Sequence, residues 1–229
     1  MKYYWCKESI NTSEIGIYPQ ALSAKNILDF NEFRFGVDEP VQRQFTLPEP
    51  ILQSRAKETT HISVVSIDYS VFLVLKNYFI EFLKDFKIAD FQSWNIDVHH
   101  KKQIVKDYSL FHLSYPSQKE IVDFEKSKFE INEDWVMRNT IGEVVKFYNY
   151  EDYLAQLKKH TTPPFLLAHE LVLDFSKQEN DILRLANMPM TGLGYYVSER
   201  LKNAIEEQKF TGFAFQEIEE MDKRIKVIY

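Results

Sequence analysis

The spacing of apolar residues changes twice between positions 61 and 98, and this change restricts the fold more than any other feature of the chain. Residues 61–68 are rich in β-branched side chains, which favour a strand. In residues 70–86 the apolar side chains recur at helical spacing, which predicts an amphipathic helix with one broad apolar face. Residues 91–98 return to a strand-like pattern. A strand, a helix and a second strand in succession exclude an all-helical and an all-β fold.

The other patterns predict two more helices and several strands. Acidic residues at the start and lysines at the end complement the dipole of a helix over residues 150–159. Ser198 is a suitable N-cap for a helix over residues 198–208. Alternating apolar side chains predict a strand over residues 165–175. Shorter strands are expected at residues 2–6, 108–115, 142–147, 212–218 and, at the edge of a sheet, 224–229.

Two stretches of the chain share one order of elements. The apolar positions of residues 75–83 match those of residues 197–205, and both sets indicate the buried face of a helix. The following turn, KIADF at 87–91, matches KFTGF at 209–213. Any amphipathic helix that leads into a strand would show this order, so a repeated helix–strand unit and a chance likeness both stay open.

These elements predict one α+β domain over residues 1–229, with a mixed or antiparallel sheet and a few amphipathic helices. Residues 61–229 form its expected core. Residues 1–60 are expected to be an irregular N-terminal part with short strands, because four prolines between positions 19 and 50 interrupt helices and strand ladders. No glycine- or serine-rich linker divides the chain into two halves.

The charge balance argues against nucleic acid as a partner. Lysine and arginine number 28 against 34 aspartates and glutamates, which gives a formal net charge of −6 at pH 7. Proteins that bind nucleic acid carry a basic footprint, because phosphate contacts supply much of their affinity. The densest basic stretch here, residues 99–102, is short. An acidic surface instead favours basic partners.

Cysteine content and hydropathy indicate a compartment. Cys6 is the single cysteine, so the chain forms no internal disulfide and fits a reducing environment. The apolar run at residues 3–6 is too short for a signal peptide. Polar side chains interrupt the most apolar window, residues 62–75, which is shorter than the ~20 residues that span a bilayer. We therefore expect a cytoplasmic protein without a membrane partner.

The sequence motifs do not indicate an enzyme. A G-x-G pair occurs at 192–194, but position 197 is valine where the dinucleotide-binding fingerprint needs its third glycine. His99 and His100 are adjacent and would point to opposite faces of a strand, so they cannot both bind one metal ion. We therefore expect no catalytic, cofactor-binding or metal-binding residues.

Single histidines leave one alternative open. His112 and His169 lie among apolar residues of the expected strands and should be buried and hydrogen-bonded, whereas His61 should face solvent. Cys6 should be a small buried side chain. The alternative is a cytosolic hydrolase or transferase with a site among His99, His112 and His169. A structural protein that interacts through an exposed aromatic patch is a third hypothesis.

The most distinctive run of residues lies near the C-terminus. Residues 194–215 read GYYVSERLKNAIEEQKFTGFAF, which contains V-S-E-R-L-K, A-I and T-G-F-x-F in that order. This run resembles the end of a family of bacterial immunity proteins associated with polymorphic toxins, and residues 66–98 are similar to the middle portion of that family. The resemblance implies a protein without catalytic residues that binds and neutralises a cognate toxin domain made by the same cell or its kin.

The expected partner-binding residues combine acids with an aromatic side chain. The run EIEEMD at 217–222 is the most concentrated acidic stretch of the chain and would suit the rim of an interface with a basic toxin domain. Trp94 or Trp135 would anchor that interface if exposed, although an indole more often packs into a core. The acidic residues expected at the rim are Glu217, Glu219, Glu220 and Asp222.

Overall fold

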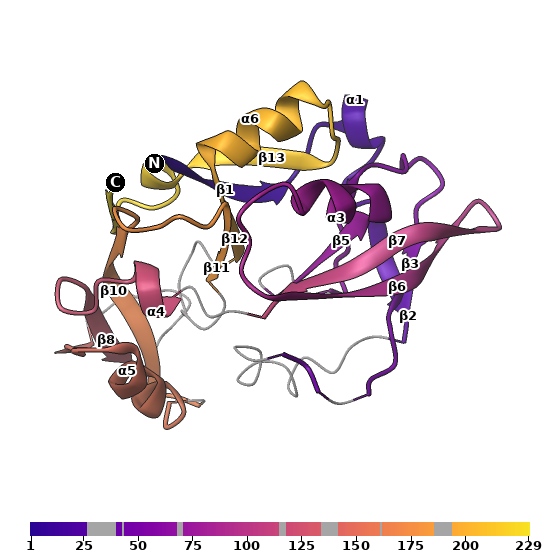
Figure 1. Cartoon of the computed structure of the whole chain (residues 1–229). Helices are drawn as coiled ribbons and strands as arrows, with labels where there is room; N and C mark the ends of the chain where they lie inside the picture. The colour runs from indigo at the N-terminus through magenta and orange to yellow at the C-terminus, as the bar shows by residue number, and fades with distance from the viewer. Residues whose placement is uncertain are drawn as a thin grey trace.

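The computed structural model describes residues 1–26, 40–42, 44–67, 71–114, 118–133, 142–160, 162–185 and 194–229. In these ranges the chain forms three sheets and several short helices (Figure 1). The sheets contain parallel as well as antiparallel pairs of strands. The predicted α+β class is therefore confirmed, with a mixed arrangement of strands.

The first sheet lies in the middle of the molecule and contains the N-terminal strand (Figure 1). Its spatial order is β11 (Ile182–Leu185), β12 (Gly194–Ser198), β1 (Tyr3–Glu8) and β13 (Phe213–Glu217). Tyr3 and Tyr196 pack into one core, whereas Cys6 and Val197 pack into another. Successive side chains of a strand point to opposite faces, so this middle sheet is buried on both sides. All five residues of β12 are buried for that reason.

The second sheet has six strands and curls on itself. Its order is β2 (Ala21–Lys25), β3 (Glu49–Leu52), β6 (Phe91–His100), β7 (Gln103–Leu113), β5 (Phe72–Lys76) and β4 (His61–Ile62). A bridge joins Ala21 at one edge to Val64, just after the strand at the other edge. The curled sheet encloses a core in which Phe72, Val74 and Leu110 are buried.

The third sheet lies at the opposite end of the molecule from the β6–β7 ribbon (Figure 1). Its order is β14 (Ile225–Ile228), β10 (Phe165–Asp174), β8 (Lys128–Asn132) and β9 (Glu143–Val145). The helices α4 (Gln118–Ile121) and α5 (Tyr150–Leu157) accompany it, and Tyr153 of α5 packs against Phe129. The strand expected over 224–229 is confirmed as an edge strand, parallel to β10.

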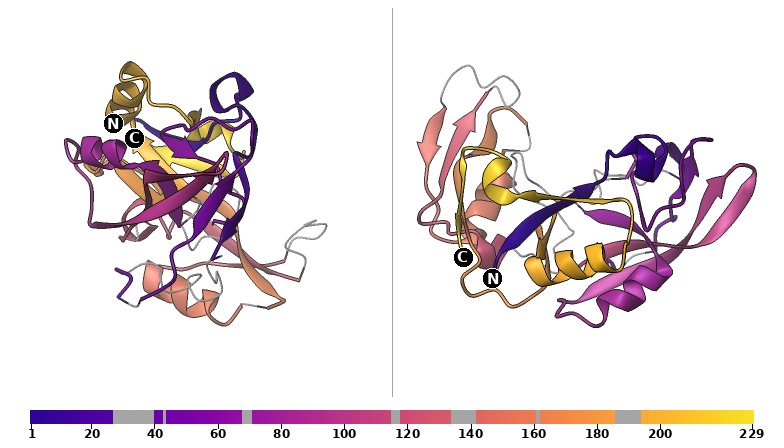
Figure 2. Two further views of the ribbon diagram at one scale, coloured as in Figure 1. Left: turned by 90° about the vertical axis from the view of Figure 1, so that its right-hand side faces the viewer. Right: turned by 90° about the horizontal axis from the view of Figure 1, so that it is seen from above.

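The matching stretches of the sequence fold into two units of the same topology. In one, β5 leads into α3 (Asn77–Leu83) and then β6; in the other, β12 leads into α6 (Glu199–Glu207) and then β13. Each unit holds a strand from outside it, β7 or β1, antiparallel between its two strands. In Figures 1 and 2, α3 and α6 lie side by side, and residues of both contribute to one core.

Reciprocal backbone bonds join these two units. The amide of His61, at the start of β4, donates to the carbonyl of Thr211 in the turn after α6, at 3.0 Å. The amide of Asp181, just before β11, donates to the carbonyl of Lys87 after α3, at 2.6 Å. The strand that flanks each unit is thus held by the turn of the other unit. The repeated helix–strand pattern of the sequence corresponds to a repeated arrangement in space.

Three expectations about secondary structure were wrong. The helix expected over residues 70–86 is a strand from Phe72 to Lys76 and a helix only from Asn77 to Leu83. Both faces of β5 are apolar. Phe72 and Val74 face one core, and Leu73 and Leu75 face the other. Such a strand has no polar face, so its apolar residues also fit helical spacing.

The other two errors concern short strands. Residues 61–68 were expected to form one strand, but β4 ends at Ile62. Residues 1–60 supply the short strands β1, β2 and β3, as expected, and also the helix α1 (Thr12–Ile15), which the sequence did not predict. Val197, expected on a helix, lies in β12 immediately before α6.

Candidate functional site

The acidic run of residues 217–222 forms an exposed turn, called the acidic turn below. Glu217 is the last residue of β13, and Glu219 and Glu220 lie in a 3-10 helix, η1 (Ile218–Glu220). Ile218 is buried and packs into the core of the third sheet, which fixes the turn on the molecule. Glu219 and Glu220 are exposed on this anchored turn, so their carboxylates face solvent.

The four acids of this turn differ in their partners. Lys2 Nζ lies 2.7 Å from Glu217 Oε1, and Arg224 Nε donates to Asp222 at 2.9 Å. The phenol of Tyr229 donates to Glu219 at 3.3 Å. Two of the expected rim acids thus pair with cations of this chain, which reduces the charge that they offer to a partner.

Trp94 lies in a different part of the molecule from the acidic turn. It is half-buried on β6 and packs into the core of the six-stranded sheet. Its ring lies 5.2 Å from that of Phe45 and 6.4 Å from that of Phe72. The structure therefore does not bring Trp94 together with the expected acidic rim. Trp135 lies outside the described residues.

The histidines differ from expectation in two cases. His61, expected to face solvent, is fully buried, and burial lowers its pKa to about 4. His169, expected in a core, is half-exposed, with Nδ1 at 3.5 Å from Glu130 Oε2. His112 is buried as expected, beside Phe72 and Trp94. No group of three or more histidine, cysteine, aspartate or glutamate residues is placed to hold a metal ion in the described ranges.

His99 and Cys6 are held in separate structural settings. His99 Nε2 lies 2.6 Å from Glu49 Oε2, and Lys25 Nζ is 3.1 Å from the same ring nitrogen. Cys6 is buried, and burial raises the pKa of its thiol to about 12, so the thiolate is suppressed at neutral pH. His99, His112 and His169 lie on β6, β7 and β10, in two different sheets.

A groove of about 500 Å³ opens on the surface beside the third sheet. Its walls come from the segment that begins in α4 and from the first turn of α5. Asn149 caps α5, because its side chain accepts a hydrogen bond from the amide of Asp152 at 2.8 Å. The residues that line this groove are Lys119, Glu120, Val122, Asp123, Phe124, Glu125, Tyr148, Asn149, Tyr150 and Glu151.

The groove carries negative charge, and it is called the acidic groove below. Four of its lining residues are carboxylates and one is a lysine. Lys119 Nζ lies 2.6 Å from Glu151 Oε1, and this hydrogen bond lowers the pKa of Glu151. Burial raises the pKa of Asp123, but hydrogen bonds from Lys126 outweigh it and the pKa is lowered. With lowered pKa values, Glu151 and Asp123 are ionised at neutral pH.

An exposed aromatic side chain stands at the acidic groove. Tyr148 is 79% exposed, the most exposed of the large apolar side chains in the described ranges, and it lines the groove. Tyr150, two residues later, is buried in the core beneath. The groove therefore offers a solvated ring next to a set of carboxylates.

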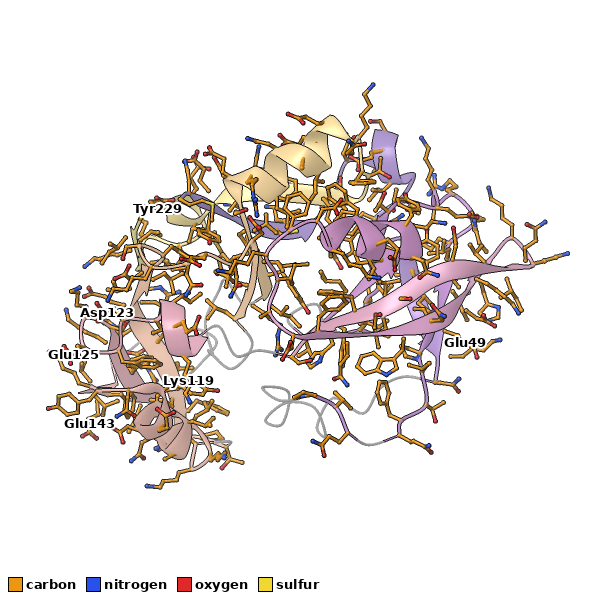
Figure 3. The ribbon with its side chains drawn as sticks, viewed as in Figure 1. Glu49, Lys119, Asp123, Glu125, Glu143 and Tyr229 are labelled. Atoms are coloured by element: carbon orange, nitrogen blue, oxygen red, sulfur yellow. The ribbon has the colours of Figure 1, made fainter. Side chains whose placement is uncertain are left out.

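Contacts within the chain connect the acidic groove to the acidic turn. Glu219 accepts from Tyr229, whose ring stacks on Phe175 at 6.1 Å. Phe175 follows Asp174, whose charge acts on Asp123 in the groove. Figure 3 shows Tyr229 and Asp123 at the same end of the molecule. We call the groove and the turn together the acidic face.

The acids of the groove were not expected from the sequence. The acids of residues 119–125 (KEIVDFE) are interleaved with apolar residues, so they do not form an acidic run like that at 217–222. A sequence signal was present nonetheless, because the acids at positions 120, 123 and 125 alternate with the apolar residues Ile121, Val122 and Phe124, which are buried.

No family model and no curated protein matches the sequence of this chain. The resemblance of residues 194–215 to immunity proteins therefore stays a prediction. Within the described ranges, no helix has the length and hydropathy needed to cross a membrane.

Proposed function

We propose that this protein is an immunity protein that neutralises a cognate toxin domain by stoichiometric binding, and that the acidic face contacts the toxin. The observation that carries the proposal is the acidic groove, which combines about 500 Å³ of concave surface with four carboxylates and one lysine. The acidic turn extends the negative charge beyond the groove. The resemblance of the C-terminal run supports the same class of function.

The chemistry of the acidic face favours a basic partner. A formal net charge of −6 attracts a basic domain over distance, and electrostatic steering raises association rates by roughly 10 to 10³-fold. Interfaces draw most of their affinity from a few anchoring side chains, with tyrosine among the most frequent. Tyr148 is placed to serve as such an anchor because it is exposed and lines the groove. Many toxin domains that act on nucleic acid are basic, so an acidic inhibitor of this kind would cover their substrate cleft.

The test is co-expression of this chain with the toxin domain encoded by the adjacent gene, followed by binding kinetics at low and high salt. A charge-reversal pair in the groove, Glu120→Lys with Glu125→Lys, changes two exposed carboxylates. The matched control, Asp85→Lys with Glu207→Lys, makes the same change of net charge on exposed positions after α3 and in α6. We expect the groove pair to slow association at least ~10-fold more than the control pair.

Each result bears on a separate part of the proposal. Failure of the unchanged chain to rescue growth or to form a complex would refute the immunity function. Rescue, with equal association rates for the groove and control pairs, would retain immunity and exclude the acidic face as the contact.

A further inference from the structure

The ribbon formed by β6 and β7 extends beyond the sheet to which it belongs. It projects from the body of the molecule, at the end opposite the third sheet (Figures 1 and 2). The strand β5 pairs with β7 only from Tyr108 onward. Residues 103–107 of β7 pair with β6 on one side, and the described residues form no strand on the other side. We call residues 99–107 the arm.

The outer edge of the arm is a free strand edge. In an antiparallel pair, alternate backbone N–H and C=O groups point away from the partner strand. Among the described segments, none makes a backbone hydrogen bond to residues 103–107 from that side. Ile104, in the strand that forms this edge, is 51% exposed. Such an edge is a ready template for one more strand.

The turn at the tip of the arm holds two cations in an unfavourable backbone conformation. Lys101 and Lys102 have φ angles of 48° and 67°, in the left-handed region that favours glycine and asparagine. This conformation costs a non-glycine residue of the order of 1 kcal/mol. The chain therefore has two lysines at a tip whose backbone conformation an Asn-Gly pair would adopt without this cost.

The cations of the arm have no acidic partner in the described part of the chain. Neither an ion pair nor a side-chain hydrogen bond joins Lys101, Lys102 or Lys106 to another described residue, and all three are exposed. Asp107, by contrast, is paired with Lys76, with Nζ at 2.7 Å from Oδ2. The arm is therefore a local positive region on a protein of net charge −6.

We propose that the arm binds an extended, acidic segment of a partner polypeptide by adding it as a strand along residues 103–107. The free edge supplies the backbone hydrogen bonds, Ile104 supplies apolar contact, and the three lysines pair with carboxylates of the segment. Charge complementarity selects this occupant, because a basic segment would be repelled by Lys101, Lys102 and Lys106. The arm and the acidic face lie at opposite ends of the molecule, so both could be occupied at once (Figures 1 and 3).

A simpler hypothesis is that these lysines only protect the strand edge from pairing with other copies of the chain. Lysine on an edge strand hinders pairing with other copies of the chain and so prevents aggregation. In that case the lysines would repel strands in general, and an acidic segment would gain nothing from them.

The test measures binding of a short fluorescein-labelled peptide of alternating valine and glutamate to the full chain by fluorescence anisotropy, at low and high salt. A valine–lysine peptide and a valine–glutamate peptide N-methylated at alternate positions are the comparison probes. N-methylation removes donors along one edge of the peptide without changing its charge. We expect the unmodified acidic peptide to bind at least ~10-fold more tightly than either of the other two.

A triple variant of the arm, Lys101→Ser with Lys102→Ser and Lys106→Ser, should lose at least ~10-fold in affinity for the acidic peptide. The matched control replaces three exposed lysines elsewhere, Lys158, Lys159 and Lys223, by serine and should bind normally. Equal loss in both variants, or no effect of N-methylation, would overturn the proposal. Unchanged peptide affinity with new self-association of the arm variant would also overturn it and assign the lysines to edge protection. The test needs no toxin, so it is independent of the proposed immunity function.

Discussion

Replacement of Asp181 by alanine should destabilise the joint between the two repeated units. This carboxylate is fully buried just before β11. It accepts hydrogen bonds from the amide of Lys87 at 2.9 Å and from the hydroxyl of Ser198 at 2.5 Å. It also pairs with the guanidinium of Arg200. Ser198 in turn caps α6 by accepting from the amide of Leu201 at 3.1 Å. One side chain thus fixes the turn after α3 and the start of α6.

The size of the effect follows from these partners. A hydrogen bond to a charged group contributes about 1.5 to 3 kcal/mol, and Asp181→Ala removes those from Lys87 and Ser198. Arg200 adds little because its side chain is 59% exposed and solvent screens the pair. We therefore expect Asp181→Ala to lower the free energy of unfolding by about 3 kcal/mol. Arg200→Gln is the matched control and should cost under ~1 kcal/mol.

The same carboxylate predicts a dependence on pH. Burial raises the pKa of Asp181, but hydrogen bonds from Arg200, Ser198 and the Lys87 amide outweigh it, so the pKa is lowered. A folded-state pKa below the unfolded value means that the stabilisation is complete above about pH 4 and is lost as pH falls through the folded pKa. The difference between the unchanged chain and Asp181→Ala should be constant from about pH 8 to 5 and should shrink below about pH 4.

Urea unfolding followed by tryptophan fluorescence measures both effects. A loss of under ~1 kcal/mol at neutral pH would show that the carboxylate does not hold the joint. A difference that persists unchanged at about pH 3 would show that the charged form of Asp181 is not responsible.

Two further predictions use the same assay. Gly212 has a φ of 90°, and a Cβ there would clash with the carbonyl of His61, so Gly212→Ala should lower the free energy of unfolding by about 3 kcal/mol. Lys209 has a φ of 56°, so the control Lys209→Gly should be neutral or stabilising. A similar loss of stability in both variants would contradict this account. Burial lowers the pKa of His61 to about 4, below the unfolded value near 6.5, so stability should be full above about pH 6.5 and fall towards pH 4. His61→Gln should weaken this dependence, and an unchanged pH profile would show that His61 does not cause it.

The local sequence was sufficient to predict those helices and strands that have one buried face and a defined end. The helix expected over residues 198–208 is observed as Glu199–Glu207, with Ser198 as its N-cap. Leu201 and Ile205 form its buried face, so the apolar period and the cap indicate the same element. The strand expected over residues 165–175 is likewise observed as Phe165–Asp174.

The local sequence was insufficient to predict a strand that is buried on both faces. Every residue of β5 is buried, because the curled sheet covers one side and the α3–α6 core the other. The alternation that identifies a strand is then absent, and the apolar run FLVLK was assigned to the helix that follows it. The register of such a strand is set by its neighbours, which are distant in sequence.

The candidate sites also differ in whether the local sequence was sufficient to predict them. The acidic turn was recognised from the sequence because its four acids lie within six consecutive residues. The acidic groove was not, because it forms only when residues near Asp123 and residues near Glu151 meet beside the third sheet. The arm likewise depends on where β5 stops pairing with β7.

The sequence by itself determined the α+β class, the capped C-terminal helix and the acidic charge of this protein, since these depend on residue type and short-range spacing. The tertiary structure alone decided that β1 lies between β12 and β13, that two units share one topology, and that one end is acidic while a basic arm projects from the other. These features depend on contacts between residues far apart in the chain. Their free energy comes from burying apolar surface and pairing backbone groups across that separation, which no local pattern encodes.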